Sequence, residues 1–490
     1  MASISKNKLK TLIEAHFENT LSKDTYTITK KKAIELLTHN RFDLAFKLFY
    51  LDMKNKNYLL AKSVYIEHIK AFSLGEFTEP GNENKNTPER FIEEFDQTFS
   101  SIKKNGFDSK QTLLPLSKDG SISNGAHRVA SAIYLNKEVE CVEIDSDSDI
   151  YDYQFFYERN VEQKILDIVA TEFIKFASNV HIAFLWPVGK ETNKKIENII
   201  PNILYKKKIK LNHNGAHNLL SQIYFGEEWL GNIENNFAGT EGKLIECFKT
   251  FDAFDVIAFQ SSNLEEVLKI KDRVRELVGV GKHSIHITDT RDEALRVANV
   301  IFNDNTLHFL NYAKPNKYLS THKKLEKYRN FLKQNDSLLS DSVLDSGIVL
   351  SAYGLRECSD IDYFIDDNNK LNYYDEELES HDEELKFHDE DKLNMIYNPK
   401  YYFYFNDIKF ISFTQLYKMK SNRAEEKDIN DCKMMEALIE NNKFKEVLNK
   451  FQQNIYYGKV KIKRKIINIL KAIGLFDRVM KFYKSIKNAK

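Results

Sequence analysis

Short apolar runs alternate with longer amphipathic segments between residues 180 and 312, and this alternation constrains the fold more than any other feature of the chain. The runs HIAFLWP, KIKLN, DVIAFQ and HSIHI have the length and composition of buried strands. LEEVLKIKDRVREL and DEALRVANVIF have the apolar spacing of helices. Such an alternation predicts a sheet with helices packed on it.

The chain holds 490 residues, more than one ordinary hydrophobic core accommodates. Apolar spacing and turn residues divide it into helical, mixed and basic stretches. We therefore predict a multidomain protein of the α/β and α+β classes. The predicted units are a helical N-terminal segment (1–75), a mixed domain (76–165), the alternating domain (178–313), a connecting helix (314–335), a second mixed domain (340–445) and a basic amphipathic tail (446–490).

Charge and cysteine content exclude several classes of protein. Lys and Arg together number 72, as do Asp and Glu, so no overall field attracts nucleic acid and we expect no nucleic-acid partner. The four cysteines form no CxxC pair, which argues against a zinc site and a disulfide framework. No apolar run is long enough to span a membrane, and the first residues, MASISKNKLK, lack the apolar segment of a secretory signal. The predicted location is the cytoplasm.

The stretch DGSISNGAHRVASAIYL, residues 119–135, predicts a turn, a short strand and a tight glycine turn that opens a helix. Gly125 allows a close backbone approach, so the helix N-terminus can face an anion. His127 and Arg128 add donors at the same place, and the arrangement suits a phosphate. The alternative is a structural turn that carries an exposed basic residue.

This stretch resembles the signature of the ParB/sulfiredoxin-like fold, in which an Asp-Gly turn precedes a Gly-x-His-Arg box. The resemblance implies a nucleotide-binding domain in which Asp119, Gly125, His127 and Arg128 hold phosphate groups. Ala126 stands at the catalytic cysteine of sulfiredoxins, so reductase chemistry is excluded.

A second Asn-Gly-Ala-His begins at residue 214, but its surroundings differ. Asn218 stands where Arg128 stands in the first copy, and no Asp-Gly turn precedes it. We interpret it as a similar strand-to-helix turn reached independently, at the edge of the site around His286.

The run GKHSIHITDT, residues 281–290, places His286 at the end of a strand with hydroxyls at the start of a helix. A histidine in this setting can accept a phosphoryl group; the alternative is a packed strand residue. With the helix before it, the run resembles the active-site region of nucleoside diphosphate kinases. The resemblance implies a ferredoxin-like βαββαβ domain with His286 as the nucleophile. Trp186 stands at that family's lysine, so ordinary nucleotide exchange is not expected.

In VLSAYGLRECSDIDYFI the sequence predicts a strand, a small-residue turn and a second strand that carries Asp360 and Asp362. Residues i and i+2 of a strand face one side, so the two carboxylates can hold Mg²⁺ together. The turn residues Ser351 and Gly354 would bring backbone amides to the phosphates of a nucleotide. The alternatives are an exposed acidic strand end and a fold that has lost its activity.

This pattern resembles the polymerase-β-type nucleotidyltransferases, and LYKMKSNRAEEKDINDC resembles their distal helix. The resemblance implies Mg²⁺-dependent transfer from a nucleoside triphosphate, with Arg423, Lys427 and Asp428 near the phosphates. The family has a third carboxylate on a later strand, where this chain has Lys409. In the acidic stretch 366–392, His381 and His388 with their neighbouring Asp residues could suggest a metal site. Charge runs are usually solvated insertions, so no role is assigned to this stretch.

The segment 458–490 carries eleven Lys and Arg residues against one Asp, with an apolar face of Ile, Leu and Phe. Such a segment can lie on an anionic bilayer, which would place the protein at the inner face of the membrane. Docking on the protein's own acidic surface is the alternative. The tail is similar to those of bacterial enzymes that build surface polysaccharides.

Together these features predict an enzyme that transfers phosphoryl or nucleotidyl groups. It would use Mg²⁺ and a nucleoside triphosphate, ATP or CTP, to act on a small sugar, polyol or phospho-alcohol in surface polysaccharide biosynthesis. The alternatives are a non-catalytic nucleotide- or glycan-binding protein of a membrane-associated synthase complex, and a nucleotidyltransferase toxin that modifies tRNA or protein.

Overall fold

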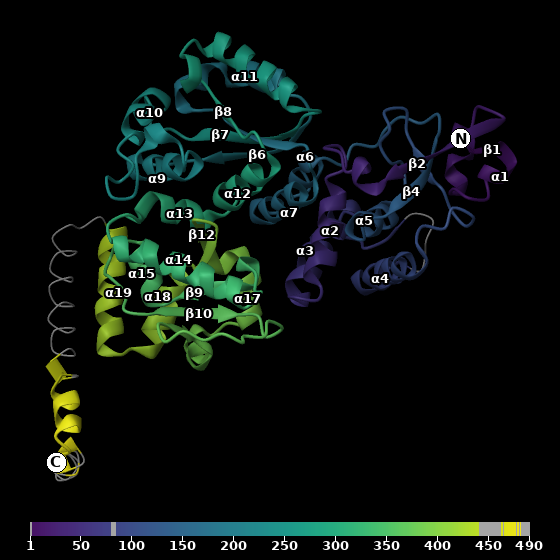
Figure 1. The fold of residues 1–490 in the computed structure, drawn as a ribbon. Helices are drawn as coiled ribbons and strands as arrows, with labels where there is room; N and C mark the ends of the chain where they lie inside the picture. Colours follow the sequence, from purple (N-terminus) through teal and green to yellow (C-terminus); the bar gives the residue numbers. More distant parts are fainter. Residues whose placement is uncertain are drawn as a thin grey trace.

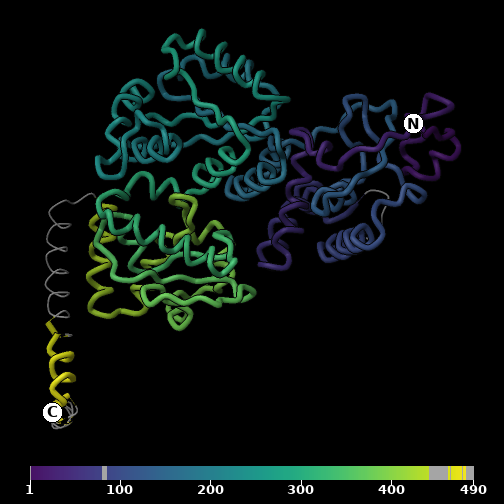
Figure 2. Tube along the Cα trace, in the orientation of Figure 1, coloured from purple at the N-terminus to yellow at the C-terminus, as the bar shows by residue number. Residues whose placement is uncertain are grey.

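The computed structural model describes residues 2–79 and 85–440, together with 462–463, 465–476, 478–479 and 481 of the basic tail. Three separate sheets follow one another along the chain, and each is accompanied by helices (Figure 1). Figure 2 shows the chain passing from the first of these units through the second into the third. The predicted multidomain architecture of mixed helices and sheets is therefore present.

The first unit is built on a four-stranded sheet with the order β1-β2-β4-β3. Its pairs are antiparallel except β3–β4, which is parallel and connected through α5. The strands are β1 (Ala2–Ser5), β2 (Thr25–Lys32), β3 (Leu114–Leu116) and β4 (Glu138–Glu143). The helices are α1 (Lys6–Leu9), α2 (Asp43–Met53), α3 (Tyr58–Phe72), α4 (Pro88–Asn105), α5 (Ala126–Tyr134), α6 (Tyr153–Tyr157) and α7 (Gln163–Phe176).

The prediction of a separate helical segment over residues 1–75 is wrong in its first half. Both β1 and β2 lie there and complete the sheet formed by β3 and β4, so residues 1–75 and 76–165 share one sheet. The run TYTIT at the start of β2 alternates Thr with Tyr and Ile, a period of two that fits a strand with one solvent-exposed face. Helical spacing begins only at α2.

The second unit has an antiparallel sheet with the order β6-β7-β5-β8. α8 connects β5 to β6, α11 connects β7 to β8, and α9 and α10 lie between β6 and β7. The strands are β5 (Val180–Phe184), β6 (Ile203–Ile209), β7 (Phe254–Gln260) and β8 (His286–Ile287). The helices are α8 (Asn193–Ile199), α9 (His213–Ile223), α10 (Thr240–Cys247), α11 (Leu264–Val278), α12 (Arg291–Ile301) and α13 (Asp304–Tyr312).

The third unit has a mixed five-stranded sheet with the order β11-β10-β9-β13-β12. The strands are β9 (Ser342–Asp345), β10 (Ile361–Ile365), β11 (Leu378–Ser380), β12 (Tyr402–Phe405) and β13 (Ile408–Ile411). The helices are α14 (Leu319–Gln334), α15 (Gly347–Ala352), α16 (Leu385–His388), α17 (Lys392–Tyr397), α18 (Phe413–Arg423) and α19 (Glu426–Ile439).

Two predictions for the third unit are corrected. The run GIVLSA, expected to be a strand, forms α15, and the strand before the turn is β9. A short apolar run that is buried on all sides has no period that separates strand from helix. The connector over 314–335 is α14, whose Tyr328 and Phe331 are buried against Tyr363 of β10. It belongs to the core of the third unit.

The three units are packed on one another. One continuous cluster of buried apolar side chains runs from Ala33 in the first unit to Met435 in the third. Figure 1 shows α13 between the second and third sheets, where Asn303 at its start donates to the carbonyl of Tyr402 at 3.1 Å.

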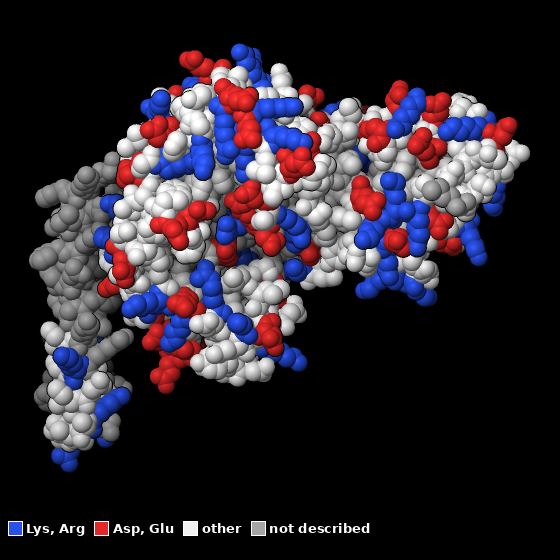
Figure 3. Space-filling model, turned by 45° about the horizontal axis from the view of Figure 1, so that its top comes forward, with Lys and Arg blue, Asp and Glu red and all other residues white. Residues whose placement is uncertain are grey.

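In the tail, residues 465–472 are helical, and their described side chains are largely exposed. No helix in the described part of the chain is long and apolar enough to cross a membrane. Basic and acidic side chains are interspersed over the face of the molecule in Figure 3.

Candidate active site

Three carboxylates meet where β9 and β10 pair. Asp345 is the last residue of β9, and Asp362 lies directly opposite it in the antiparallel register. Asp360 lies one residue before β10, and its charge acts on Asp362. The predicted pair Asp360 and Asp362 is thus joined by a third carboxylate from the neighbouring strand.

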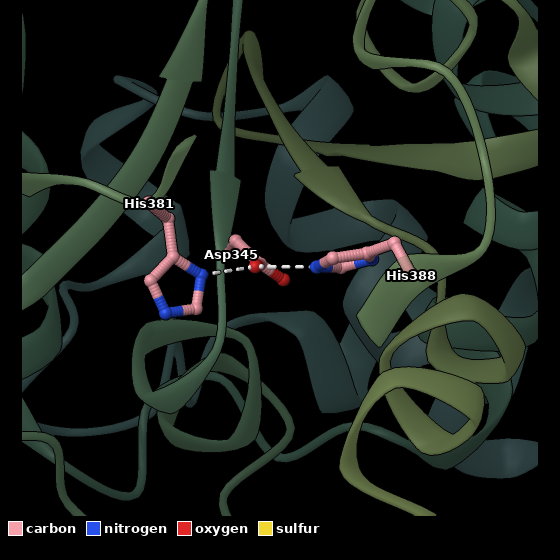
Figure 4. A group of neighbouring side chains, drawn as sticks. All are labelled: Asp345, His381 and His388. Atoms are coloured by element: carbon pink, nitrogen blue, oxygen red, sulfur yellow. Dashed lines mark hydrogen bonds and ion pairs between the residues drawn. The ribbon is translucent and has the colours of Figure 1, made fainter. Parts of the chain in front are cut away.

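Two histidines from the acidic stretch hold Asp345 (Figure 4). Its Oδ2 accepts a hydrogen bond from His381 Nδ1 at 2.6 Å and another from His388 Nε2 at 3.0 Å. Asp345 and His388 are completely buried, and Gln415 fixes the second histidine by donating to its carbonyl at 2.8 Å. The three side chains have ligand atoms close enough to hold a metal ion. Among the described residues, Asp345 Oδ1 is buried without a hydrogen-bond partner.

The electrostatics of Asp345 and Asp362 differ. Burial by itself raises the pKa of Asp345, but the two imidazoles outweigh it and hold the pKa well below its usual range. The negative charge of Asp362 has fewer positive neighbours. Burial raises the pKa of Asp362 to about 6, and the charges of Asp360 and Asp345 act in the same direction. His381 opposes this shift. A divalent cation at Asp360 and Asp362 would supply the missing countercharge.

The turn that follows β9 consists of Ser346 and Gly347 and leads into α15. Ser346 has φ +60°, an uncommon value for a residue with a side chain, and its hydroxyl bonds the carboxylate of Asp362. A Cβ on Gly347 would lie 3.7 Å from the guanidinium of Arg356, which is itself held by two bonds to Asp431. This turn brings a strained backbone, a hydroxyl and a guanidinium beside the carboxylates.

Ser351 and Gly354, the predicted turn residues, lie elsewhere. Ser351 is buried on α15, and its hydroxyl is 2.6 Å from that of Thr321 on α14. Gly354 has φ +74°, and its carbonyl accepts a bond from Lys317. Because GIVLSA is a helix, the strand-to-helix turn lies five residues earlier than expected, at Ser346.

The cationic side chains expected to bind phosphates pair with carboxylates instead. Arg423 donates two hydrogen bonds to Asp428, at 2.8 and 2.9 Å, and a third to Glu384 at 3.2 Å. Lys427 lies 3.1 Å from Glu425 at the surface. These contacts join α18, α19 and the acidic stretch, so a phosphate would have to displace the pairing of Arg423.

In the first unit, the predicted phosphate box is largely engaged in internal contacts. Gly125 has φ +90° and precedes α5, as the sequence indicates. His127 points into the core: its Nε2 lies 2.6 Å from the hydroxyl of Tyr65, and burial, with nearby Lys47, holds its pKa well below the ordinary value. Arg128 donates to the hydroxyl of Thr112.

Asp119 closes its own turn. Its carboxylate accepts bonds from the hydroxyl of Ser117 at 2.7 Å and from the amide of Ser121 at 2.9 Å. Of the four predicted phosphate ligands, only the backbone at Gly125 is therefore placed as expected.

His286 begins β8 in the second unit. Its ring contacts Tyr224 and Phe184, and its Nε2 is 3.4 Å from a carboxylate oxygen of Glu293. The hydroxyls predicted beside it have structural partners: Thr288 accepts from the amide of Ile182 and Thr290 caps α12. His286 borders a cavity that is described below.

Sequence reasoning missed Asp345, Ser346, His381 and His388. The signals were present, because an Asp-Ser pair ends the apolar run VLD and two histidines interrupt an acidic stretch. Their meeting depends on the β9–β10 register and on the path of the chain after β11. Charge density alone predicts a solvated segment, which the burial of both histidines contradicts.

No protein-family model matches the chain, and neither a curated protein nor a solved structure is significantly similar to it.

Proposed function

We propose that the chain is a Mg²⁺-dependent transferase of phosphorus-containing groups, with its centre at the paired ends of β9 and β10. The observation that carries this proposal is the convergence of Asp345, Asp360 and Asp362 beside the Ser346–Gly347 turn. A pair of carboxylates with incomplete compensation at Asp362, next to the Ser346–Gly347 turn, suits a cation that carries a nucleotide phosphate.

The proposed roles divide between the two strands. Asp360 and Asp362 hold Mg²⁺, whose chemistry is to neutralise the phosphates of the donor and to polarise the phosphorus under attack. Asp345 holds His381 through Nδ1, which leaves Nε2 as the atom that accepts the proton of an acceptor hydroxyl. The donor is a nucleoside triphosphate, ATP or CTP, and the acceptor a small sugar, polyol or phospho-alcohol of a surface polysaccharide.

The relationships of the three units are part of this proposal. The strand order β6-β7-β5-β8, its antiparallel pairing and the crossovers α8 and α11 support a ferredoxin-like βαββαβ unit, with His286 as a phosphoryl acceptor. The parallel pair β3–β4 with α5 between supports a ParB/sulfiredoxin-like first unit. The order β10-β9-β13 supports a nucleotidyltransferase-like third unit. The basic tail, most of which lies outside the described residues, would hold the enzyme at the inner face of the membrane.

The test is turnover of each nucleoside triphosphate with Mg²⁺, followed by release of pyrophosphate and by mass spectrometry of the products. Asp360→Asn and Asp362→Asn should each lower turnover at least about a hundredfold, because each removes a carboxylate that stabilises the transferred group through the metal. Asp367→Asn is the matched control, since Asp367 pairs with Lys392 at the surface of the same unit. Turnover that survives in the double variant, or that falls equally in the control, would contradict the assignment.

A non-catalytic assembly protein is the second candidate, and one observation favours it. His127 and Arg128 in the first unit, and Arg423 in the third, are engaged with protein groups rather than turned toward a ligand. Calorimetric titration with ATP and CTP in the presence of Mg²⁺ separates the two: the enzyme requires binding that depends on Asp360 and Asp362, and the assembly protein does not.

A further inference from the structure

The second unit contains a cavity of about 630 Å³, far from the carboxylates of the third unit. Its walls come from α10, from the outer face of α11, from residues 282–287 and from the connection after α9. Tyr224 and Trp229 belong to that connection. The volume lies in the range of sites that enclose a small organic molecule.

The lining of this cavity is strongly basic. Lys243 comes from α10, Lys271 and Arg275 come from α11, and Lys282 follows that helix, whereas Glu227 is the one acidic residue of the lining. Two of these side chains are paired with carboxylates: Lys271 with Asp289, and Arg275, through Nη1, with Asp272 at 3.0 Å. In the part of the chain that the structure describes, neither Lys243 nor Lys282 forms an ion pair.

The positive charges of Lys243, Arg275 and Lys282 are close enough to repel one another. Lys243 donates to the backbone carbonyl of Lys282 at 2.9 Å, which places its ammonium beside the segment that carries Lys282. Burial lowers the pKa of Lys243, and the neighbouring charges of Arg275 and Lys282 lower it further. An anion between these side chains would remove the repulsion.

Two nitrogen atoms at the cavity lack hydrogen-bond partners. Within the described residues, Arg275 Nε and His283 Nδ1 are buried without one, whereas His286 Nε2 faces the carboxylate of Glu293 at 3.4 Å. Leaving such groups buried and unpaired is unfavourable unless a ligand satisfies them. A phosphate presents several acceptor oxygens at one point and therefore fits this set of donors.

Aromatic side chains complete the lining, and the ammonium of Lys243 lies over the ring of Tyr224, 5.2 Å from its centroid. Trp229 is 45% exposed, and its ring lies 5.2 Å from that of Tyr224, which also contacts His286. An exposed indole beside a cationic pocket offers a stacking face for a ring attached to the anion. Gly239 allows the backbone to pack directly against Trp229, because a Cβ at this position would collide with the carbonyl of Trp229.

We propose that this cavity binds an organic phosphate, with the phosphate among Lys243, Arg275 and Lys282 and its ring against Trp229. The ring belongs to a nucleoside or a sugar, since either can stack on an indole. The site needs no metal and no phosphorylation of His286, so it goes beyond the transfer reaction proposed for the third unit.

Calorimetric titration of the full chain in EDTA with CDP, glucose 1-phosphate and pyrophosphate tests the proposal. Tryptophan fluorescence recorded in parallel locates the ligand, because Trp229 is exposed while Trp186, the other tryptophan, is completely buried. We expect saturable binding of at least one ring-bearing phosphate with a change in emission that Trp229→Phe abolishes. The double variant Arg275→Ala, Lys282→Ala should bind at least about tenfold more weakly.

Lys269→Ala is the matched control, since Lys269 lies on the same helix but outside the cavity, paired with Glu265. It should change affinity by less than about twofold. Equal weakening in this control would show general charge attraction and overturn the site, as would absence of binding at about 10 mM ligand. Pyrophosphate that binds as tightly as both ring-bearing ligands would overturn the stacking role of Trp229. Binding should persist in the Asp360→Asn, Asp362→Asn variant, which separates this site from the transferase centre.

Discussion

Lys409 on β13 stands at the strand position where a third metal-binding carboxylate was expected. It is buried between the rings of Tyr397 and Tyr402, and its ammonium donates to the carbonyls of Ser340 and Ile396. Burial lowers the pKa of Lys409 to about 7, although Asp341 opposes the shift. Lys409 therefore has a structural role in the third unit. The third carboxylate beside Asp360 and Asp362 comes from Asp345 on the neighbouring strand β9.

This burial has a consequence for stability against pH. The folded-state pKa of Lys409 lies below the unfolded value of about 10.4, so between about pH 7 and pH 10 the unfolded chain binds more protons at this group. Its contribution to the free energy of unfolding therefore rises with pH in that window. The difference between the wild-type protein and Lys409→Met should accordingly increase from pH 7 to pH 9.5 in urea unfolding.

Lys400→Met is the control for this measurement, because Lys400 is exposed and lies over the ring of Tyr401. Its effect should be small and nearly independent of pH. A difference for Lys409→Met that stays constant across the window would show that the ammonium keeps its charge in the folded state.

The repeated Asn-Gly-Ala-His shows at the residue scale how much of the local structure the same four residues determine in two different surroundings. In both copies a helix begins at or near the glycine, as predicted. Only Gly125 is in the left-handed region, whereas Gly215 lies inside α9, where a Cβ would collide with Asn311. In the second copy Asn218 donates to the carbonyls of Leu310 and Ala313, so this copy packs α9 on α13 rather than facing a ligand.

At the scale of elements, a buried ion-pair network joins α18 and α19. From the sequence, two of its members, Arg423 and Asp428, are expected to lie near the phosphates of a nucleotide. Lys420 lies between Asp428 at 3.0 Å and Asp431 at 2.9 Å, and all three side chains are buried. Arg423 and Arg356 complete the charge balance. The spacing in KMKSNRAEEKDIND is thus explained by the docking of two helices.

Lys420→Met should lower the free energy of unfolding by about 3 kcal/mol, because it leaves two buried carboxylates with less compensation. Lys418→Ala is the matched control on the same helix, since Lys418 pairs with Asp389 at the surface and such pairs contribute less than about 1 kcal/mol. Urea unfolding measures both variants. Equal losses would contradict the view that burial makes the difference.

Buried strands and long helices with a marked period were predictable, and a short buried helix was not. The strands β5 and β7 and the helix α11 follow from apolar runs and helical spacing, and α11 begins at the Asn263 cap and ends before Gly279. The run that forms α15 was assigned the wrong class because its residues are apolar on every side. For this reason the sequence predicts the strand-to-helix turn at Ser351, whereas the structure has it at Ser346.

At the scale of the whole molecule, asparagine side chains join the second and third units. Asn303 caps α13 through Oδ1, and its amide donates to the carbonyl of Tyr402. Asn305 donates to the carbonyls of Pro399 and Lys400. Polar groups that bridge two sheets in this way make their unfolding cooperative.

Asn303→Ala should lower the free energy of unfolding by about 2 kcal/mol, because it removes a helix cap and the shorter of the two hydrogen bonds that the carbonyl of Tyr402 accepts. Calorimetry should also show a broader transition, as the two units begin to unfold apart. Asn263→Ala is the matched control: Asn263 caps α11 at the surface and forms no contact with another unit, so only the cap, about 1 kcal/mol, is lost. A transition broadened equally in both variants would contradict the bridging role.

The sequence by itself determined the elements with a clear period, such as α11, and the succession of several units, and it placed Asp360 and Asp362 together at the start of a strand. Each of these depends on neighbours in the chain and on a period of two or 3.6 residues. The tertiary structure alone decided that Asp345, His381 and His388 meet, and that the cations around Trp229 enclose a cavity. Those groups lie on segments far apart in the sequence, and their meeting depends on strand register and helix packing, which local patterns do not encode.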